Sequence, residues 1–212
     1  MKRIVWDWNG TLMDDVSVCN GVLNRMLARR GVAPVEREKY REIFTFPVAD
    51  YYREAGFDFE KEPFPVLAEE YMADYGAHVD GCPLIDGGKE GLHRLACAGF
   101  RQDILSATRQ AELTGQVYDR GIGGLFDEIC GTDTILAHGK RETALAWRER
   151  HREELARAFF VGDSPHDAEV AELMGIRPLL VSWGHVSRRR LLETGYPVFD
   201  GLSPLLDYLE ER

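Results

Sequence analysis

The stretch Ile4-Val5-Trp6-Asp7-Trp8-Asn9-Gly10-Thr11-Leu12 decides the fold, because an apolar run ends there on an acidic residue and a glycine-bearing turn. The run before Asp7 predicts a short buried strand that carries a carboxylate at its carboxyl end. Gly10 leaves room for backbone amides to approach a ligand. Such a carboxylate can be a nucleophile or a metal ligand, although Asp before Asn-Gly is also ordinary turn chemistry. The motif by itself leaves both interpretations open.

Further apolar runs of strand length follow at residues 103–105, 128–130, 158–161 and 179–181, most of them separated by stretches of helical length. This alternation, from about residue 85 onward, predicts a parallel sheet flanked by helices. Ligands of such sheets bind outside the carboxyl ends of the strands. Asp7, Ser106 and Asp163 each fall just past the end of one of these runs. We therefore expect an α/β fold with a Rossmann-like core and with these three residues at its ligand-binding edge.

Residues 14–83 have a different pattern, which is helical and rich in Tyr and Phe. Gly and Pro residues mark flexible turns near the end of this segment. We expect two domains, a catalytic core of residues 1–13 and 84–212 and an inserted all-helical cap of residues 14–83. The insertion is either a lid over the strand ends or a packing subdomain.

Composition limits the function classes. The chain has 212 residues, 44% of them hydrophobic, and a formal net charge of -10, which disfavours nucleic acid as a partner. No apolar run approaches the roughly 20 residues of a membrane helix, and the chain start shows no signal-peptide pattern, so we expect a cytoplasmic protein without a membrane partner. The four cysteines form no Cys-x-x-Cys pair and are expected to be reduced core thiols.

A second acidic cluster, Gly162-Asp163-Ser164-Pro165-His166-Asp167, follows the apolar run 158–161. Ser164 suits a helix N-cap and Pro165 the first helical position, so a helix should begin there. Asp163 and Asp167 can together bind a hard cation. Alternatively, Asp167 complements the helix dipole while Asp163 caps a loop.

Two further residues suit an anion site. Ser106 offers a hydroxyl to a phosphate oxygen, although Ser in such a position is often a turn residue. Lys140 opens a predicted helix that runs to about Arg150, where a cation opposes the helix dipole unless an anion or carboxylate lies beside it. No phosphate-binding P-loop, dinucleotide fingerprint or serine nucleophile elbow competes with this site. His166 and His185 are expected to be surface or loop residues, because no histidines form a metal-type pair.

Taken in order, Asp7-x-Asn9-Gly10-Thr11, Ser106, Lys140 and Gly162-Asp163-x-x-x-Asp167 resemble the four motifs of the haloacid dehalogenase superfamily, most of whose members are phosphatases. The resemblance covers nearly the whole chain. The helical insertion and Ser182-Trp183-Gly184 are similar to the phosphoglycolate-phosphatase-like subgroup.

The resemblance implies that Asp7 attacks phosphorus and forms an aspartyl-phosphate that water hydrolyses. It implies Mg²⁺ as the cofactor, held by Asp7, the backbone carbonyl of Asn9 and Asp163, with Asp167 supporting Asp163 or a metal-bound water. Lys140 would neutralise charge shared by Asp7 and the phosphate. The expected substrate-binding residues are Gly10, Thr11, Ser106, Ala107 and Lys140.

The chain departs from the family at Asn9, where phosphatases of this family normally have an Asp that protonates the leaving oxygen and later activates water. An amide can do neither, and general acid–base help is worth about 10²- to 10⁴-fold. Three alternatives remain: activity on good leaving groups such as acyl phosphates, replacement of the acid by Asp14 or Asp15, or phosphate binding without turnover. Deamidation at Asn9-Gly10 could also restore an Asp.

We expect a Mg²⁺-dependent phosphatase for a small phosphorylated metabolite, slow or restricted to good leaving groups. The alternative is a catalytically silent phosphometabolite-binding or interaction protein of the same fold. Metal-independent dehalogenation is a third possibility, which the Asp163 and Asp167 pair disfavours. The sequence leaves the substrate and the oligomeric state, monomer or homodimer, open.

Overall fold

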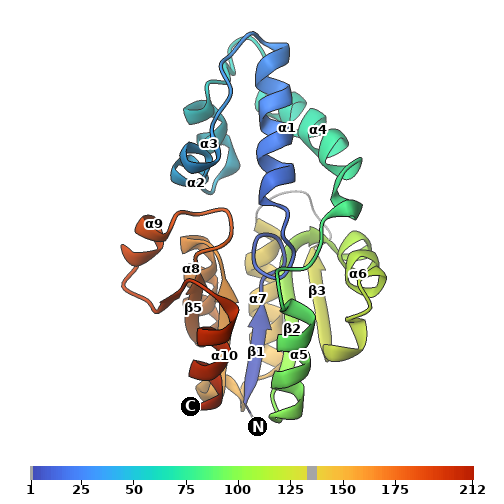
Figure 1. Cartoon of the computed structure of the whole chain (residues 1–212), viewed down its shortest axis with the longest axis vertical. Helices are drawn as coiled ribbons and strands as arrows, with labels where there is room; N and C mark the ends of the chain where they lie inside the picture. The colour runs from blue at the N-terminus through green and yellow to red at the C-terminus, as the bar shows by residue number, and fades with distance from the viewer. Residues whose placement is uncertain (1, 133–137) are drawn as a thin grey trace.

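The computed structural model describes residues 2–132 and 138–212, and the strands of this part of the chain form one parallel sheet (Figure 1). The strands pair in the order β3-β2-β1-β4-β5-β6. Their bounds are Arg3–Trp6 for β1, Arg101–Arg109 for β2, Glu128–Thr132 for β3, Ala158–Gly162 for β4, Arg177–Val181 for β5 and Val198–Phe199 for β6. The predicted α/β class with a Rossmann-like parallel sheet is confirmed.

Helices cover both faces of the sheet, so the central strand β1 is buried on each side. Ile4 and Trp6 share a hydrophobic cluster with side chains of α5 (Gly88–Cys97), α6 (Gln110–Asp119) and α10 (Leu202–Glu210). Val5 instead belongs to a cluster with side chains of α7 (His138–Arg150) and α8 (Pro165–Met174). Alternate strand residues point to opposite faces, which explains why this strand is continuously apolar. The remaining short elements in this region are η2 (Gly123–Leu125), η3 (Leu155–Arg157) and α9 (Arg188–Leu192).

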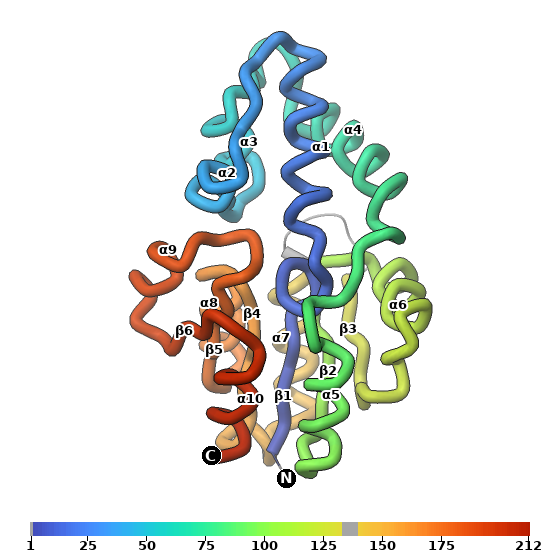
Figure 2. The backbone as a smooth tube through the Cα atoms, viewed as in Figure 1, coloured from blue at the N-terminus to red at the C-terminus, as the bar shows by residue number. Residues whose placement is uncertain are grey.

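A helical segment lies between β1 and β2, beyond the carboxyl ends of the strands (Figure 2). It contains α1 (Val16–Arg29), α2 (Arg37–Ile43), α3 (Val48–Ala55), α4 (Phe64–Gly76) and η1 (Val79–Gly81). These helices pack around a hydrophobic cluster of their own, which includes Leu23, Tyr52 and Leu67. The chain enters and leaves side by side, since Asp14 N donates to Pro83 O at 2.9 Å. The predicted division into a core and a cap at residues 13/14 and 83/84 stays a prediction.

The structure differs from the sequence prediction in three details. Ser106 lies inside β2 rather than after it, because β2 continues past a register shift with β3 between Leu105 and Arg109. The edge strand β6 was not predicted, since two residues carry no periodic signal. Cys97 is exposed rather than in the core. None of the described helices has the length and apolar character that a membrane crossing requires.

Candidate active site

Asp7 follows β1 directly and lies at the centre of a buried ionic cluster. Its main-chain N donates to Val161 O at 2.8 Å, which fixes its position between β1 and β4. Lys140, in the first turn of α7, donates from Nζ to Asp7 Oδ1 and to Asp167 Oδ1, both at 2.6 Å. Lys140 is only 4% exposed. These two carboxylates are the partners that its unfavourable position at a helix amino end led us to expect.

The helix after β4 begins where the sequence predicted, and its cap positions two carboxylates. Ser164 is the N-cap of α8 and Pro165 its first residue. Ser164 N donates to Asp167 Oδ2 at 3.0 Å, which closes a capping box. Asp163 Oδ1 accepts from Thr11 Oγ1 at 3.2 Å, and its Oδ2 accepts from the main chain of His185. Asp167 therefore caps the helix and also binds Lys140, while its predicted role in binding a metal ion stays a prediction.

Asp7, Asp163 and Asp167 offer carboxylate oxygens that lie within 4.8 Å of one another. Burial is the main cause that raises the pKa of Asp7, although Lys140 opposes it. Burial likewise raises the pKa of Asp163 to about 6. Burial would also raise the pKa of Asp167, but Lys140 outweighs it and the net shift is downward. Three carboxylates against one ammonium leave an excess negative charge that a divalent, oxygen-preferring cation would neutralise.

The turn after Asp7 packs so tightly against Asp163 that only glycine fits at position 10. Gly10 has a φ of +70°, and a Cβ there would lie 2.6 Å from Asp163 Oδ2. Its N–H donates to Met13 O and to Asp15 Oδ1, both at 2.9 Å, while Thr11 N donates to Trp8 O at 3.3 Å. These amides thus bond within the turn and its flank. The predicted substrate-binding role of Gly10 and Thr11 stays a prediction.

Both ends of the Asn9 amide are held by hydrogen bonds. Its Nδ2 donates to Asp15 Oδ2 at 2.9 Å and to the hydroxyl of Tyr75 at 2.8 Å. Its Oδ1 accepts from Thr108 Oγ1 at 2.8 Å. The side chain at this position is therefore oriented by groups from the turn, from α4 and from β2.

Ser106 reaches this network through Thr108. Ser106 Oγ donates to Thr108 Oγ1 at 3.1 Å and accepts from Thr108 N at 3.1 Å. The neighbouring Ala107 is exposed, and its carbonyl accepts from Thr132 Oγ1 at 3.1 Å. Sequence reasoning missed Thr108, although a second hydroxyl two positions along a strand lies on the same face and was a usable signal.

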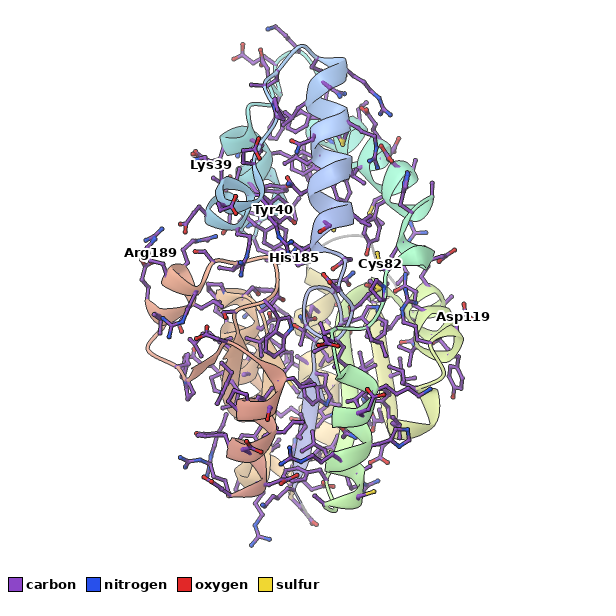
Figure 3. All side chains as sticks on the ribbon, in the orientation of Figure 1. Lys39, Tyr40, Cys82, Asp119, His185 and Arg189 are labelled. Atoms are coloured by element: carbon purple, nitrogen blue, oxygen red, sulfur yellow. The ribbon has the colours of Figure 1, made fainter. Side chains whose placement is uncertain are left out.

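His185 lies in the loop after β5, as one of the two expectations had it, but it is buried in the site rather than at the surface. It is 5% exposed and its Nε2 lies 3.2 Å from Asp15 Oδ1, while its Nδ1 lies 2.7 Å from the Tyr40 hydroxyl. Figure 3 shows Tyr40 and His185 next to each other between the helical segment and the sheet. The ring also stacks on Phe44, with centroids 4.8 Å apart. Nothing in the sequence indicated this burial, because a single histidine in a loop after a strand belongs to no hydrophobic pattern.

Asp15 and His185 form an ion pair. Burial lowers the pKa of His185, but Asp15 outweighs it and the net value is raised to about 9. Burial would raise the pKa of Asp15, yet His185 and the hydrogen bonds from Asn9 and Tyr75 lower it to about 2. A carboxyl group that stays ionised is a poor proton donor, so the structure does not support Asp15 as the replacement acid. Asp15, Cys19 and His185 lie close enough together to bind a metal ion in principle. The ion pair of Asp15 with His185 is already neutral, however, so this group does not call for a cation.

We expect the free energy of unfolding to fall as the pH rises through about 9, because His185 then loses its proton. The pKa of His185 in the folded state lies above its ordinary value of 6.5. The ion pair therefore stabilises the fold fully below pH 6.5, and this contribution of about 3 kcal/mol is lost at alkaline pH. Chemical denaturation between pH 6 and 10 measures it. His185→Gln should lack this component, whereas the control His93→Gln, at an exposed position, should keep it. Identical pH profiles for wild type and His185→Gln would contradict the ion pair.

Comparisons with known proteins agree with this fold and with the resemblance to the haloacid dehalogenase superfamily. A family model described as haloacid dehalogenase-like hydrolase matches residues 4–181. A phosphoglycolate phosphatase of Synechococcus elongatus is 23% identical over 192 residues, which is 91% of this chain and 89% of that protein.

Two solved structures have the same fold. A predicted phosphatase from Clostridium acetobutylicum superposes with a TM-score of 0.83 at 17% identity, over 100% of this chain and 99% of that one. A haloacid dehalogenase-like family hydrolase from Streptococcus pneumoniae gives a TM-score of 0.82 at 19% identity, over 98% of both chains.

Proposed function

Because the chain belongs to the haloacid dehalogenase-like hydrolase family, we propose that it is a Mg²⁺-dependent phosphatase that acts on a small phosphomonoester through an aspartyl-phosphate on Asp7. The observation that carries the proposal is the buried contact of Asp7 with Lys140, beside Asp163 and Asp167 at the carboxyl edge of the sheet. Relatives named as phosphoglycolate phosphatases support a phosphate ester as the substrate. The proposal includes a small phosphorylated metabolite as the partner and the cytoplasm as the compartment.

The proposed first step is attack of an Asp7 carboxylate oxygen on phosphorus, with cleavage of the bond between phosphorus and the ester oxygen. Water then attacks the phosphorus of the acyl phosphate, so that inorganic phosphate leaves and the Asp7 carboxylate is regenerated. Lys140 holds the attacking carboxylate and opposes the charge of the phosphoryl group. Ser106, at 1% exposed, is positioned beside this edge and would donate to a phosphoryl oxygen.

The carboxylates fit a magnesium ion, because they bring hard oxygen donors together with an excess of negative charge. Asp7, Asp163 and the backbone carbonyl of Asn9 would hold the ion, and Asp167 would support Asp163 or a metal-bound water. When bound, the ion would offset the repulsion between the anionic nucleophile and the anionic ester. Asn9 would slow both steps or restrict them to good leaving groups, since its amide transfers no proton.

The helical segment 14–83 is proposed to act as a cap that closes over the site. Tyr75 of α4 donates to Asp15 Oδ2 at 2.8 Å within this segment, and Arg41 of α2 accepts at 3.0 Å from Ser187 N in the loop after β5. Closure would exclude water during the reaction, and reopening would release phosphate.

A phosphate-release screen tests the function. We expect Mg²⁺-dependent release from acetyl phosphate and p-nitrophenyl phosphate, with phosphoenzyme accumulating before slow turnover, because the second step lacks its base. Sugar, nucleotide and glycolate phosphates complete the panel, and EDTA should remove activity that added Mg²⁺ restores. Phosphate binding without phosphoenzyme or turnover would favour the silent binding protein. Chloride release from a 2-haloacid without Mg²⁺ would favour dehalogenation.

A further inference from the structure

The carboxylate of Asp15 lies so close to the side chain of residue 9 that acidic residues at positions 9 and 15 exclude each other. This inference rests on the proposed function. We infer that Asp15 is a positioning residue that requires an amide at position 9 and thereby leaves the site without a general acid. The substrates are then phosphates with good leaving groups. The consequence is that Asn9→Asp by itself does not restore ester hydrolysis. Both positions must change together.

The two oxygens of Asp15 have separate sets of donors. Oδ1 accepts from Gly10 N at 2.9 Å and lies 3.2 Å from His185 Nε2. Oδ2 accepts from Asn9 Nδ2 at 2.9 Å and from the Tyr75 hydroxyl at 2.8 Å. The carboxylate is fully buried. Only Oδ2 of Asp15 therefore depends on a donor from residue 9, and it shares that position with the Tyr75 hydroxyl.

An Asp at position 9 would place an acceptor where Asn9 now presents its donor. Its oxygen would face Asp15 Oδ2 across the present 2.9 Å separation, and two like charges at that distance in a buried site repel strongly. The Tyr75 hydroxyl, which now donates to Asp15 and accepts from Asn9, cannot serve both carboxylates with its single proton. A carboxylate at position 9 would therefore turn away or lose the orientation that Thr108 gives to Asn9.

Moving the amide from position 9 to position 15 satisfies every one of these groups. In Asp15→Asn the amide oxygen can keep the Gly10 and His185 donors, and the new NH₂ group lies where Oδ2 accepted from Asn9. An Asp at position 9 then accepts from that NH₂ group, from Thr108 and from Tyr75. The number of carboxylates is unchanged, so only the place of the charge differs.

The experiment compares wild type, Asn9→Asp, Asp15→Asn and the double variant Asn9→Asp/Asp15→Asn, with Mg²⁺ and a series of phosphate monoesters of increasing leaving-group pKa. We expect no gain for Asn9→Asp and a loss for Asp15→Asn, whereas the double variant should exceed wild type by about 10²-fold in kcat on poor leaving groups. The dependence of kcat on leaving-group pKa should become shallower only in the double variant, which a purely structural effect would not produce. Peptide mass spectrometry confirms that Asn9 has not deamidated in the wild-type sample.

The matched control is Asn9→Asp/Asp80→Asn, which has the same net charge as the double variant. Asp80 is exposed, so its removal should not rescue Asn9→Asp. A gain in Asn9→Asp as large as in the double variant, or a double variant that stays folded and gains nothing over an active wild type, overturns the inference.

Thermal unfolding separates this inference from the proposed function. Asn9→Asp should lower Tm by about 4 °C or more, and the added Asp15→Asn change should restore it. If no variant hydrolyses any ester but this coupling in Tm is present, the pairing of positions 9 and 15 stands and the phosphatase proposal fails. An unchanged Tm in Asn9→Asp overturns the pairing itself.

Discussion

Asp7→Asn is expected to abolish phosphate release, with kcat lower by a factor on the order of 10⁴ or more, because the amide cannot attack phosphorus or form the acyl phosphate. The fold should survive, since burial raises the pKa of Asp7 and a neutral side chain of the same shape removes that cost. Phosphate release under Mg²⁺ saturation and a thermal unfolding curve for the same sample measure both effects.

A folded Asp7→Asn variant that retains a tenth of the wild-type kcat would remove Asp7 from the role of nucleophile. Phosphoenzyme trapping adds a second measurement, because label from acetyl phosphate should be retained by wild type and not by the variant. The control is Asp50→Asn, an exposed carboxylate on α3 whose removal should leave kcat unchanged.

Lys140→Met is expected to lower the free energy of unfolding by about 3–5 kcal/mol at neutral pH, because it leaves two buried carboxylates without their common cation. Asp7 and Asp167 are 8% and 2% exposed, so water compensates little for the loss. The variant should also lose activity, since no cationic side chain then offsets the repulsion between the Asp7 carboxylate and an anionic ester. Chemical denaturation gives the stability, with phosphate release measured in parallel.

The loss of folding stability in Lys140→Met should depend on pH and on Mg²⁺. It should be smaller at pH 5 than at pH 8, because protonated carboxyl groups need no partner, and Mg²⁺ should recover part of it. Lys39→Met, which breaks a surface pair with Glu54, is the control and should cost less than about 1 kcal/mol. Equal effects of the two substitutions would show that the Lys140 cluster contributes no more than a surface pair.

Much of the active site could be predicted because its residues follow features of local sequence. Asp7 and Asp163 directly follow apolar strands, and Ser164-Pro165 marks a helix start by its capping chemistry. Parallel strands bring their carboxyl ends to one edge, so residues far apart in the chain could be expected to meet there. An anionic partner for Lys140 followed from its place at a helix amino end, whereas Asp7 as that partner followed from the family resemblance.

The partners of Asn9 could not be predicted in this way. Tyr75 and Thr108 reach it from α4 and β2, and His185 reaches Asp15 from the loop after β5. These contacts depend on how the helical segment packs against the sheet, which no short motif encodes. The assignment of Asp15 changed for the same reason, since its low pKa arises mainly from His185, which lies far away in sequence, with further hydrogen bonds from Asn9 and Tyr75.

The sequence by itself determined the α/β class, five of the six strands described, the helix start at Pro165 and the acidic residues at the strand ends. Those features follow from hydrophobic periodicity and capping, which act over a few residues. Only the tertiary structure decided that Asn9 is held between Asp15, Tyr75 and Thr108 and that His185 is buried beside them. The physical reason is that hydrogen-bond geometry and desolvation depend on distances between segments that packing alone brings together.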